Sequence, residues 1–440
     1  MTDEVRLRPL AREPVAGTRA LWSGLDAAAT PGFTLATLAV LVRALSASDY
    51  GLLVMALAAS GLSLAINPAI AATTTKFVSE LSGQRNSSSG TIAGVITISL
   101  TTVAVIDFII LSGTAIFSEP LSRWVFGGAV ASSRDVSQVL LLAVLSVAIQ
   151  QIDAVLAAAI RGLERFRRQA LIEMLSRGTL TAVIIYVAWY TRSVAMVLIA
   201  QSAVYFASVL VRAIALRELL PGRRLLGTTS WVGAGRIIRY GGWMWLTALA
   251  GVAYTSADRI IIGRILGAAA AGQYNVYLQI TQVIHFIPSS AFAFSLPAFS
   301  RLAAQGGAGR NEIGRTYQVY LCTISMTAVG FAAAMMASWP VLLRVFAGIG
   351  SADGRLGAPL LLTLNFLLLA CNVAPYYLLI ALGHAKAVSM ITTLSMLVAL
   401  VLMAVLIPRY GMEGAAVARL AYGAGALLLL WQARRLLQWK

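Results

Sequence analysis

Charged and redox-active side chains are scarce in this chain. Only 12% of its 440 residues are Asp, Glu, Lys or Arg, and 59% are hydrophobic, whereas soluble domains carry about 25% charged and about 45–50% apolar residues. Two cysteines and two histidines offer no spacing for a disulfide framework or a zinc site. This composition argues against a water-soluble fold and against redox chemistry, and it predicts neither a metal nor a cofactor.

Catalytic motifs are also absent from the sequence. The chain has no G-x-x-x-x-G-K-[ST] loop for nucleotide phosphates. It has no Ser/His/Asp set and no paired carboxylates in a loop of workable size. We therefore expect that the protein is not an enzyme and has no catalytic residues. If ATP drives its function, a separate subunit must bind the nucleotide.

Long hydrophobic runs dominate what is present. At about 20 residues per span, the apolar residues suffice for roughly twelve membrane-crossing helices. Twelve tracts are found at 20–45, 50–75, 91–117, 138–160, 169–190, 194–216, 236–258, 265–298, 313–341, 357–382, 387–408 and 412–433. Prolines predict bends in four of these tracts, at Pro31, Pro68, Pro288 and Pro375. The sequence thus predicts an all-α polytopic membrane protein, in which the first tract is retained as a span rather than cleaved as a signal peptide.

Positive charge is distributed unevenly between the two sides of this array. The formal net charge is +17, and the segments on the side of both termini hold 24 Lys and Arg against 10 on the other side. Basic loops stay cytoplasmic during insertion, so both termini are predicted to be cytoplasmic, with the chain in a bacterial inner membrane. The basic clusters have no interleaved aromatic residues, which argues against nucleic-acid binding.

The chain reads as two halves of six helices each. A Pro- and Gly-containing basic segment lies at its midpoint, and residues 221 positions apart match in the two halves. The matching pairs are Trp22 and Trp243, Arg43 and Arg264, Gly51 and Gly272, Ser79 and Ser300, Leu81 and Leu302, and Gly162 and Gly383. We predict a cytoplasmic segment at 1–19, an N-terminal lobe at 20–216, a linker at 217–235, a C-terminal lobe at 236–433 and a tail at 434–440. Two such lobes suit a pseudo-symmetric transporter.

An ordered series of motifs resembles one known family. The motifs are LVRALSASDYGLLVMALAASG at 41–61, RGLERF at 161–166, YTSADRIIIGRILGAAAAGQYNVY at 254–277, PSSAFAFSLPAFSRL at 288–302 and LIPRYGMEGAAVARL at 406–420. Together they resemble the polysaccharide-transporter branch of the multidrug/oligosaccharidyl-lipid/polysaccharide (MOP) flippases. The resemblance implies two six-helix lobes around a central cavity. It also implies movement of a polyprenyl-diphosphate-linked oligosaccharide across the membrane for O-antigen, capsule or exopolysaccharide synthesis, with membrane lipids, a glycan polymerase or glycosyltransferases as further contacts.

Two other functions stay open at this stage. A cation-coupled drug antiporter of the same superfamily would need a smaller cavity centred on carboxylates. A non-transporting scaffold for glycan assembly would need no charge inside the membrane, which the intramembrane ionisable groups argue against.

Ionisable side chains inside the tracts are the candidates for the cavity and for coupling to H⁺ or Na⁺. They are Asp26, Asp153 and His285. A charge in the bilayer centre costs about 3 kcal/mol or more, so such groups face a cavity or a partner. For Asp153, a position facing the cavity and a buried position with a hydrogen-bond partner are equally favoured. For His285, a buried histidine with its hydrogen bonds satisfied is favoured. For Asp107, we expect a structural partner on a neighbouring helix.

The ends of the tracts supply the remaining candidates. The Asp258-Arg259 pair matches the family's Asp-Arg pair at the periplasmic end of tract seven, where gating or contact with Arg43 or Asp49 is implied. A lipid diphosphate needs cationic partners, and Arg19, Lys76 and Arg239 lie on the predicted loading side. Interfacial anchoring is the competing interpretation for these cations.

Overall fold

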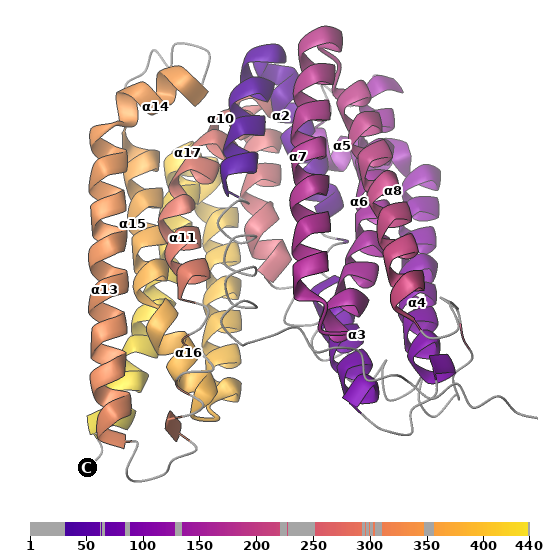
Figure 1. The fold of residues 1–440 in the computed structure, drawn as a ribbon. Helices are drawn as coiled ribbons and strands as arrows, with labels where there is room; N and C mark the ends of the chain where they lie inside the picture. Colours follow the sequence, from indigo (N-terminus) through magenta and orange to yellow (C-terminus); the bar gives the residue numbers. More distant parts are fainter. Residues whose placement is uncertain are drawn as a thin grey trace, which may run out of the picture. The chain divides into compact units, whose positions relative to one another are not determined.

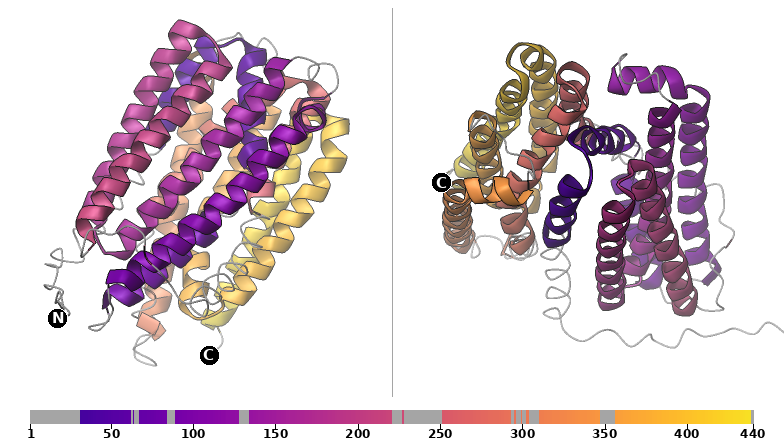
Figure 2. Two further views of the ribbon diagram at one scale, coloured as in Figure 1. Left: turned by 90° about the vertical axis from the view of Figure 1, so that its right-hand side faces the viewer. Right: turned by 90° about the horizontal axis from the view of Figure 1, so that it is seen from above.

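The computed structural model contains helices and no strands in the part of the chain that it describes. The described residues are 31–61, 63, 67–83, 89–127, 134–220, 227, 251–292, 295, 299, 302–303, 310–346 and 356–438. Figure 1 shows the helices labelled along the chain, and Figure 2 gives two further views. The all-α polytopic fold predicted from the sequence is confirmed.

Contacts divide the chain into two compact units. Unit 1 comprises 1–26, 59–124 and 128–252, and unit 2 comprises 27–58, 125–127 and 253–440. The labelled helices of unit 1 are α3 (Asn67–Gly83), α4 (Ser89–Ile116), most of α5 (Ser118–Phe126), α6 (Arg134–Gly162), α7 (Phe166–Thr191) and α8 (Val194–Leu219). Unit 2 holds the helix at 31–44, most of α2 (Ala47–Gly61), the helix at 251–266, α10 (Ala268–Thr281), α11 (Val283–Ala291), α13 (Arg310–Ala337), α14 (Trp339–Phe346), α15 (Gly357–Cys371), α16 (Val373–Ala381) and α17 (Ala385–Gln438). Residues 31–58 therefore associate with unit 2, although the residues that follow them, 59–124, belong to unit 1.

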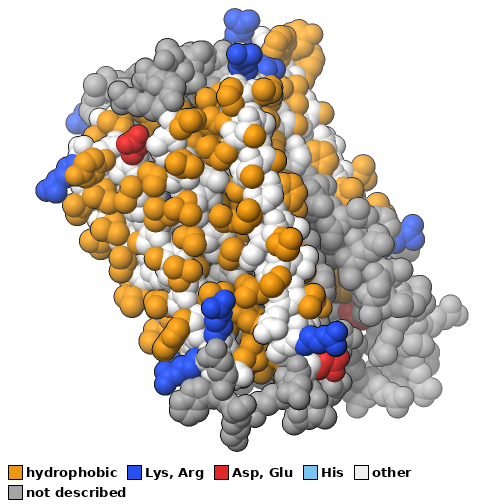
Figure 3. Space-filling model, turned by 90° about the vertical axis from the view of Figure 1, so that its left-hand side faces the viewer, with side chains coloured by type: hydrophobic (Ala, Val, Ile, Leu, Met, Phe, Trp, Pro, Cys, Tyr) orange, Lys and Arg blue, Asp and Glu red, His pale blue; other side chains and the backbone are white. Residues whose placement is uncertain are grey.

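Seven helices in the described part of the chain are long and apolar enough to cross a membrane. They run over Ile92–Ile116, Asp135–Gly162, Phe166–Thr191, Val194–Leu219, Glu312–Ala337, Gly357–Ala381 and Lys386–Leu437. The last contains tracts eleven and twelve, because α17 continues through a turn at Gly411, where φ is 59° and ψ is −136°. Figure 3 shows one face, where hydrophobic side chains cover the middle and most Lys and Arg gather toward the two ends. Such a banded surface suits a bilayer.

Several of the predicted tracts are broken helices. Tract two contains α2 and α3, tract eight breaks at Gln282 between α10 and α11, and tract ten breaks at Asn372 between α15 and α16. The last break lies one turn before Pro375, whose ring clashes with the carbonyl four residues earlier. Pro68 instead falls in the first turn of α3, where a missing N–H costs nothing.

The internal repeat at 221 residues is visible in the helix boundaries. Two helices of the second half each begin 221 residues after their counterparts, α10 after α2 and α14 after α5. Helix α13 likewise ends, at Ala337, 221 residues after the end of α4 at Ile116. The sequence therefore duplicates not only individual residues but also a long helix followed by a short amphipathic one.

Equivalent glycines of the two repeats meet within unit 2. A Cβ atom on Gly51 of α2 would lie 1.8 Å from the carbonyl oxygen of Ala268, and one on Gly272 of α10 would lie 3.2 Å from the Gly51 backbone. Tyr50 precedes Gly51 in the chain, and its hydroxyl accepts a 2.8 Å hydrogen bond from the side-chain amide of Asn275 on α10. Only a residue without a side chain allows this helix crossing, and the crossing ties α2 to α10.

Candidate functional site: buried charge in two units

Unit 1 contains a buried ionic network that joins three helices. Arg212 of α8 is 1% exposed, and its Nε lies 2.8 Å from Oδ1 of Asp153 on α6. Its Nη2 donates a 2.6 Å hydrogen bond to Oε2 of Glu173 on α7. One guanidinium therefore bridges carboxylates on two neighbouring helices, in a geometry that fits its fixed fork of donors.

The unit 1 network is complete in both charge and hydrogen bonds. Arg212 Nη1 donates to Gln169 at 2.8 Å, and Ser208 donates to Asp153 at 2.8 Å. Arg177 Nε adds a second cation, 2.7 Å from Glu173. Two carboxylates thus face two guanidiniums. This arrangement fits the structural alternative for Asp153, because a balanced network stabilises helix packing and leaves little unused binding capacity.

Asp107 of α4 has the neighbouring-helix partner that the sequence predicted. Gln151 of α6 donates a 2.7 Å hydrogen bond to its Oδ1. Asp107 is only 7% exposed, so this hydrogen bond is buried. Both helices belong to unit 1.

Unit 2 contains a second buried cluster, centred on Asp258. The carboxylate is fully buried and accepts a 2.7 Å hydrogen bond from Arg419 Nε of α17, which is 3% exposed. Arg259 Nε lies 3.8 Å from Asp258, and its Nη2 donates to the Thr255 carbonyl. The Arg419 guanidinium also lies 4.7 Å from the centre of the Tyr254 ring. Two guanidiniums therefore face one carboxylate, which leaves an excess of one positive charge in this cluster.

Unused hydrogen-bonding groups surround this carboxylate. Among the described residues, Arg419 Nη2 and Arg259 Nε are buried donors of this cluster that have no hydrogen-bond partner. Burying a polar group without a partner costs about 1–3 kcal/mol. The Asp258 cluster therefore differs from the unit 1 network, because its cations outnumber its carboxylates and two of its donor atoms are unused.

Arg43 and Asp49 lie close together in sequence within unit 2, on either side of the start of α2. Arg43 is exposed on the helix at 31–44. The Asp49 carboxylate accepts a 2.7 Å hydrogen bond from the Ser46 hydroxyl, and the Asp49 backbone N–H donates to Ser46 Oγ at 3.1 Å, so Ser46 caps the start of α2. Asp258 pairs with Arg419 and Arg259, and a contact of the Asp258-Arg259 pair with Arg43 or Asp49 stays a prediction.

The other candidates divide between described and undescribed residues. His285 lies on α11 with a buried Nδ1 that has no partner in the described part of the chain. Lys76 is exposed on α3, with its Nζ 5.7 Å from the Phe77 ring. Arg19, Asp26 and Arg239 lie outside the described residues.

Sequence reasoning missed Arg212, Glu173 and Arg419 as members of buried clusters. Arg212 and Arg419 were counted as loop charges in the topology assignment, and Glu173 was not considered, although Arg419 lies eight residues beyond the Gly411 turn, which is about 12 Å of helix. The rule for ionisable groups inside tracts would have found it, because residues 412–433 were themselves assigned as a span.

Solved structures with the same fold are transporters. One similar structure is the inward-facing form of a multidrug resistance MATE family transporter of the MOP superfamily, with a TM-score of 0.69, 15% identity, and coverage of 94% of this chain and 98% of that chain. Another is the lipid II flippase MurJ in an inward closed conformation, with a TM-score of 0.67, 14% identity, and coverage of 95% and 88%. A third is a MOP superfamily transporter from Pyrococcus furiosus Vc1 (DSM3638), whose binding pocket is described as reversed in polarity, with a TM-score of 0.62, 14% identity, and coverage of 96% and 95%. The chain therefore shares the fold of these solved structures.

A family model then narrows the assignment. The model for polysaccharide biosynthesis proteins matches residues 19–303. This chain belongs to the polysaccharide biosynthesis protein family, as the motif resemblance predicted. No curated protein matches the sequence.

Proposed function

We propose that the protein is a flippase that moves a polyprenyl-diphosphate-linked oligosaccharide across the bacterial inner membrane by alternating access. The observation that carries the proposal is membership of the polysaccharide biosynthesis family in a chain with a transporter fold. The transported lipid would supply O-antigen, capsule or exopolysaccharide synthesis. It is a transporter in this proposal, not an enzyme.

The charge of the Asp258 cluster supports a flippase over a cation antiporter. Two guanidiniums and one carboxylate give a positive site, which attracts an anionic head group and repels a cationic drug. A drug antiporter would need the reverse balance. The overall net charge of +17 is in keeping with handling an anionic lipid.

Orientation and coupling complete the proposal. Both termini lie in the cytoplasm, in keeping with the 24 to 10 charge bias. Arg19, Lys76 and Arg239 receive the diphosphate on the cytoplasmic side. Either H⁺ or Na⁺ drives the cycle through Asp26, Asp153 or His285, while Arg43, Asp258 and Arg259 act in gating. Glycosyltransferases or a glycan polymerase contact the protein in the membrane.

Deletion of the protein should trap its substrate. In a strain without a redundant flippase, lipid-linked repeat units should accumulate on the cytoplasmic leaflet, and surface polysaccharide should be lost. The measurement is the fraction of lipid-linked glycan that a periplasmic glycosidase can reach in spheroplasts. Normal surface polysaccharide in the deletion strain would exclude the proposed role.

Neutralising a loading-side cation should slow transport. Replacing Lys76 by Gln removes the positive charge that, in this proposal, meets the diphosphate. A charge-assisted contact that is desolvated when the substrate binds is worth about 1.5–3 kcal/mol, so transport should fall by roughly one to two orders of magnitude. The same outcome is expected for Arg239→Gln. The measurement is transport rate per unit of folded protein in membranes.

The matched controls are Arg223→Gln and Arg224→Gln, in the linker predicted at 217–235. Charges in water are screened by salt, so these changes should cost far less. Reporter fusions after residue 224 verify that every variant keeps its orientation. Equal sensitivity of the linker pair and the loading-side pair would mean that Lys76 and Arg239 serve only membrane topology.

A further inference from the structure

The two halves of α17 form an antiparallel pair that is closed at one end and open at the other. Near the Gly411 turn, a Cβ on Gly414 would lie 2.3 Å from the Leu406 carbonyl oxygen, and farther along a Cβ on Gly425 would lie 2.0 Å from Ser395 Oγ. The halves therefore touch from the turn as far as Gly425. From Gly425 to Arg435 is about 15 Å of helix, and a pocket lies between the halves at the Arg435 end.

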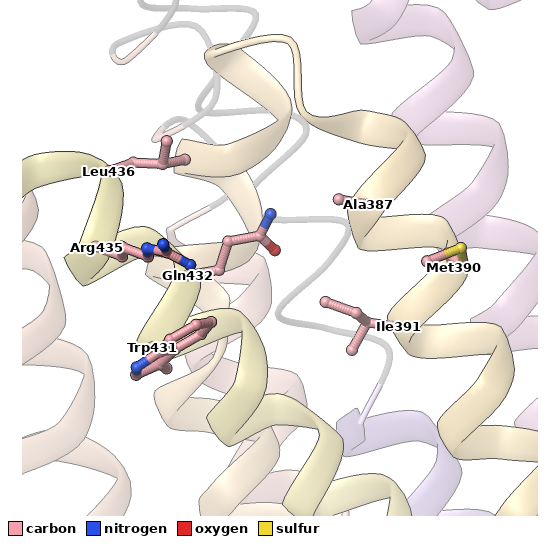
Figure 4. Close-up of a pocket in the computed structure, with 7 residues that line it drawn as sticks. All are labelled: Ala387, Met390, Ile391, Trp431, Gln432, Arg435 and Leu436. Carbon is pink, nitrogen blue, oxygen red and sulfur yellow. The ribbon is translucent and has the colours of Figure 1, made fainter. Parts of the chain in front are cut away.

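This pocket, called the wedge pocket below, has one apolar wall and one mixed wall that combines apolar and polar side chains. Its volume is about 520 Å³. Ala387, Met390 and Ile391 line it from the first half of α17, with spacings of three and four residues that place them on one helix face. Facing them in Figure 4 are Trp431, Gln432 and Arg435 of the second half. Beneath the wedge the core is buried and apolar, and includes Val388, Leu429 and Ala433.

The mixed wall has a polar atom whose hydrogen-bonding capacity is unused. Gln432 Oε1 is buried and has no hydrogen-bond partner among the described residues. Because an amide oxygen only accepts, the missing partner is a donor such as a hydroxyl. Three residues away, the Arg435 guanidinium lies 5.3 Å from the Trp431 ring centre, which holds a cation at the mouth of an apolar wedge.

The charges that α17 itself brings to the mouth of the pocket are positive. Lys386, Arg434 and Arg435 lie at this end of α17, whose single acidic residue, Glu413, lies near the opposite end. The second half of α17, from 412 to 438, is about 40 Å long, against about 30 Å for the hydrocarbon core. Its last turns therefore reach the head-group layer, where Trp and Arg are favoured.

We propose that this wedge pocket binds one phosphatidylglycerol molecule. An acyl chain lies along Ala387, Met390 and Ile391, the phosphate meets Arg435, and a head-group hydroxyl donates to Gln432 Oε1. The combination of an apolar slot, a cation and an orphan acceptor selects an anionic lipid with a hydroxylated head group over zwitterionic phosphatidylcholine. The site belongs to unit 2 alone and does not depend on the proposed flippase function.

Native mass spectrometry of the full-length protein in detergent tests the site. Phosphatidylglycerol, phosphatidic acid and phosphatidylcholine with identical acyl chains are titrated separately, and polyprenyl phosphate is added as a competitor. Phosphatidylglycerol should bind most tightly. Arg435→Gln should weaken its binding by about ten- to hundredfold, and Gln432→Leu should remove its advantage over phosphatidic acid.

Two further variants make the result decisive. Arg434→Gln removes the same charge one residue away, from a position that does not line the pocket, and should change binding by less than about twofold. Ala387→Trp fills the slot without altering charge and should also abolish tight binding, with an unchanged melting temperature as evidence of folding. The proposal is overturned by equal effects of Arg434→Gln and Arg435→Gln, by equal affinity for phosphatidylcholine, or by tighter binding of polyprenyl phosphate.

Discussion

Replacing Asp258 by Asn should remove most of the folded protein from the membrane. The change leaves Arg419, which is 3% exposed, and Arg259, whose side chain is 20% exposed, without the carboxylate that both face. Leaving one member of a buried ion pair uncompensated costs about 3–5 kcal/mol, a large part of the about 5–15 kcal/mol that stabilises a typical protein. The measurement is the monodisperse fraction and melting temperature after extraction in detergent.

The partner substitutions give an ordered series. Arg419→Gln should be milder, because Arg259 stays 3.8 Å from the carboxylate and keeps the pair neutral. The double variant Asp258→Asn/Arg419→Gln should recover part of the loss, since it removes both members of the closest pair. Arg409→Gln, at an exposed position of the same helix α17, should have almost no effect. Wild-type stability of Asp258→Asn would contradict the buried ion pair.

Replacing Gly51 by Ala should disrupt the crossing of α2 and α10. The new methyl group would lie 1.8 Å from the Ala268 carbonyl oxygen, and backbone cannot swing aside as a flexible side chain can. Overpacking costs about 1–3 kcal/mol even where side chains adjust, so we expect at least the upper end of that range. A drop of several degrees in melting temperature and a lower membrane level are the expected readouts.

A helical glycine in the same unit serves as the control. A Cβ on Gly330 of α13 would meet nothing within 4 Å, so Gly330→Ala should leave the melting temperature unchanged or raise it slightly. Gly272→Ala should also destabilise the protein, but by less than Gly51→Ala. The nearest atom to a Cβ on Gly272 would be Cδ1 of the Tyr50 ring, at 2.9 Å, and a side chain can move where backbone cannot. Equal behaviour of Gly51→Ala and Gly330→Ala would refute the close approach.

The sequence predicted those parts of the fold that depend on hydropathy and repetition. Tracts of apolar residues predicted the helices, and the offset that pairs Gly51 with Gly272 also relates the last residues of α4 and α13. Breaks inside tracts were harder to locate. Pro288 and Pro375 marked bends in tracts eight and ten, yet the helices separate at Gln282 and Asn372, six and three residues earlier.

The candidate site was predictable only one residue at a time. Asp153 stood out because a carboxylate inside an apolar tract is costly, and Asp258 because the Asp258-Arg259 pair resembles the family's pair at the end of tract seven. Their partners did not, since Arg212 follows Asp153 by 59 positions and Arg419 follows Asp258 by 161. Pairing over such distances is decided by helix packing, which a single sequence does not encode locally. The excess positive charge at Asp258 became visible only when both arginines were placed beside it.

Flipping by the purified protein tests the central claim most directly. The protein is reconstituted into liposomes that contain a fluorescent polyprenyl-diphosphate-linked oligosaccharide in both leaflets, and a membrane-impermeant quencher is added outside under a proton or sodium gradient. Without protein, only the outer half of the label should be quenched. With protein, quenching should proceed toward completion at a rate that falls in the Lys76→Gln variant. Quenching that stops at the outer half, together with gradient-driven uptake of an organic cation by the same vesicles, would contradict the flippase and identify a drug antiporter.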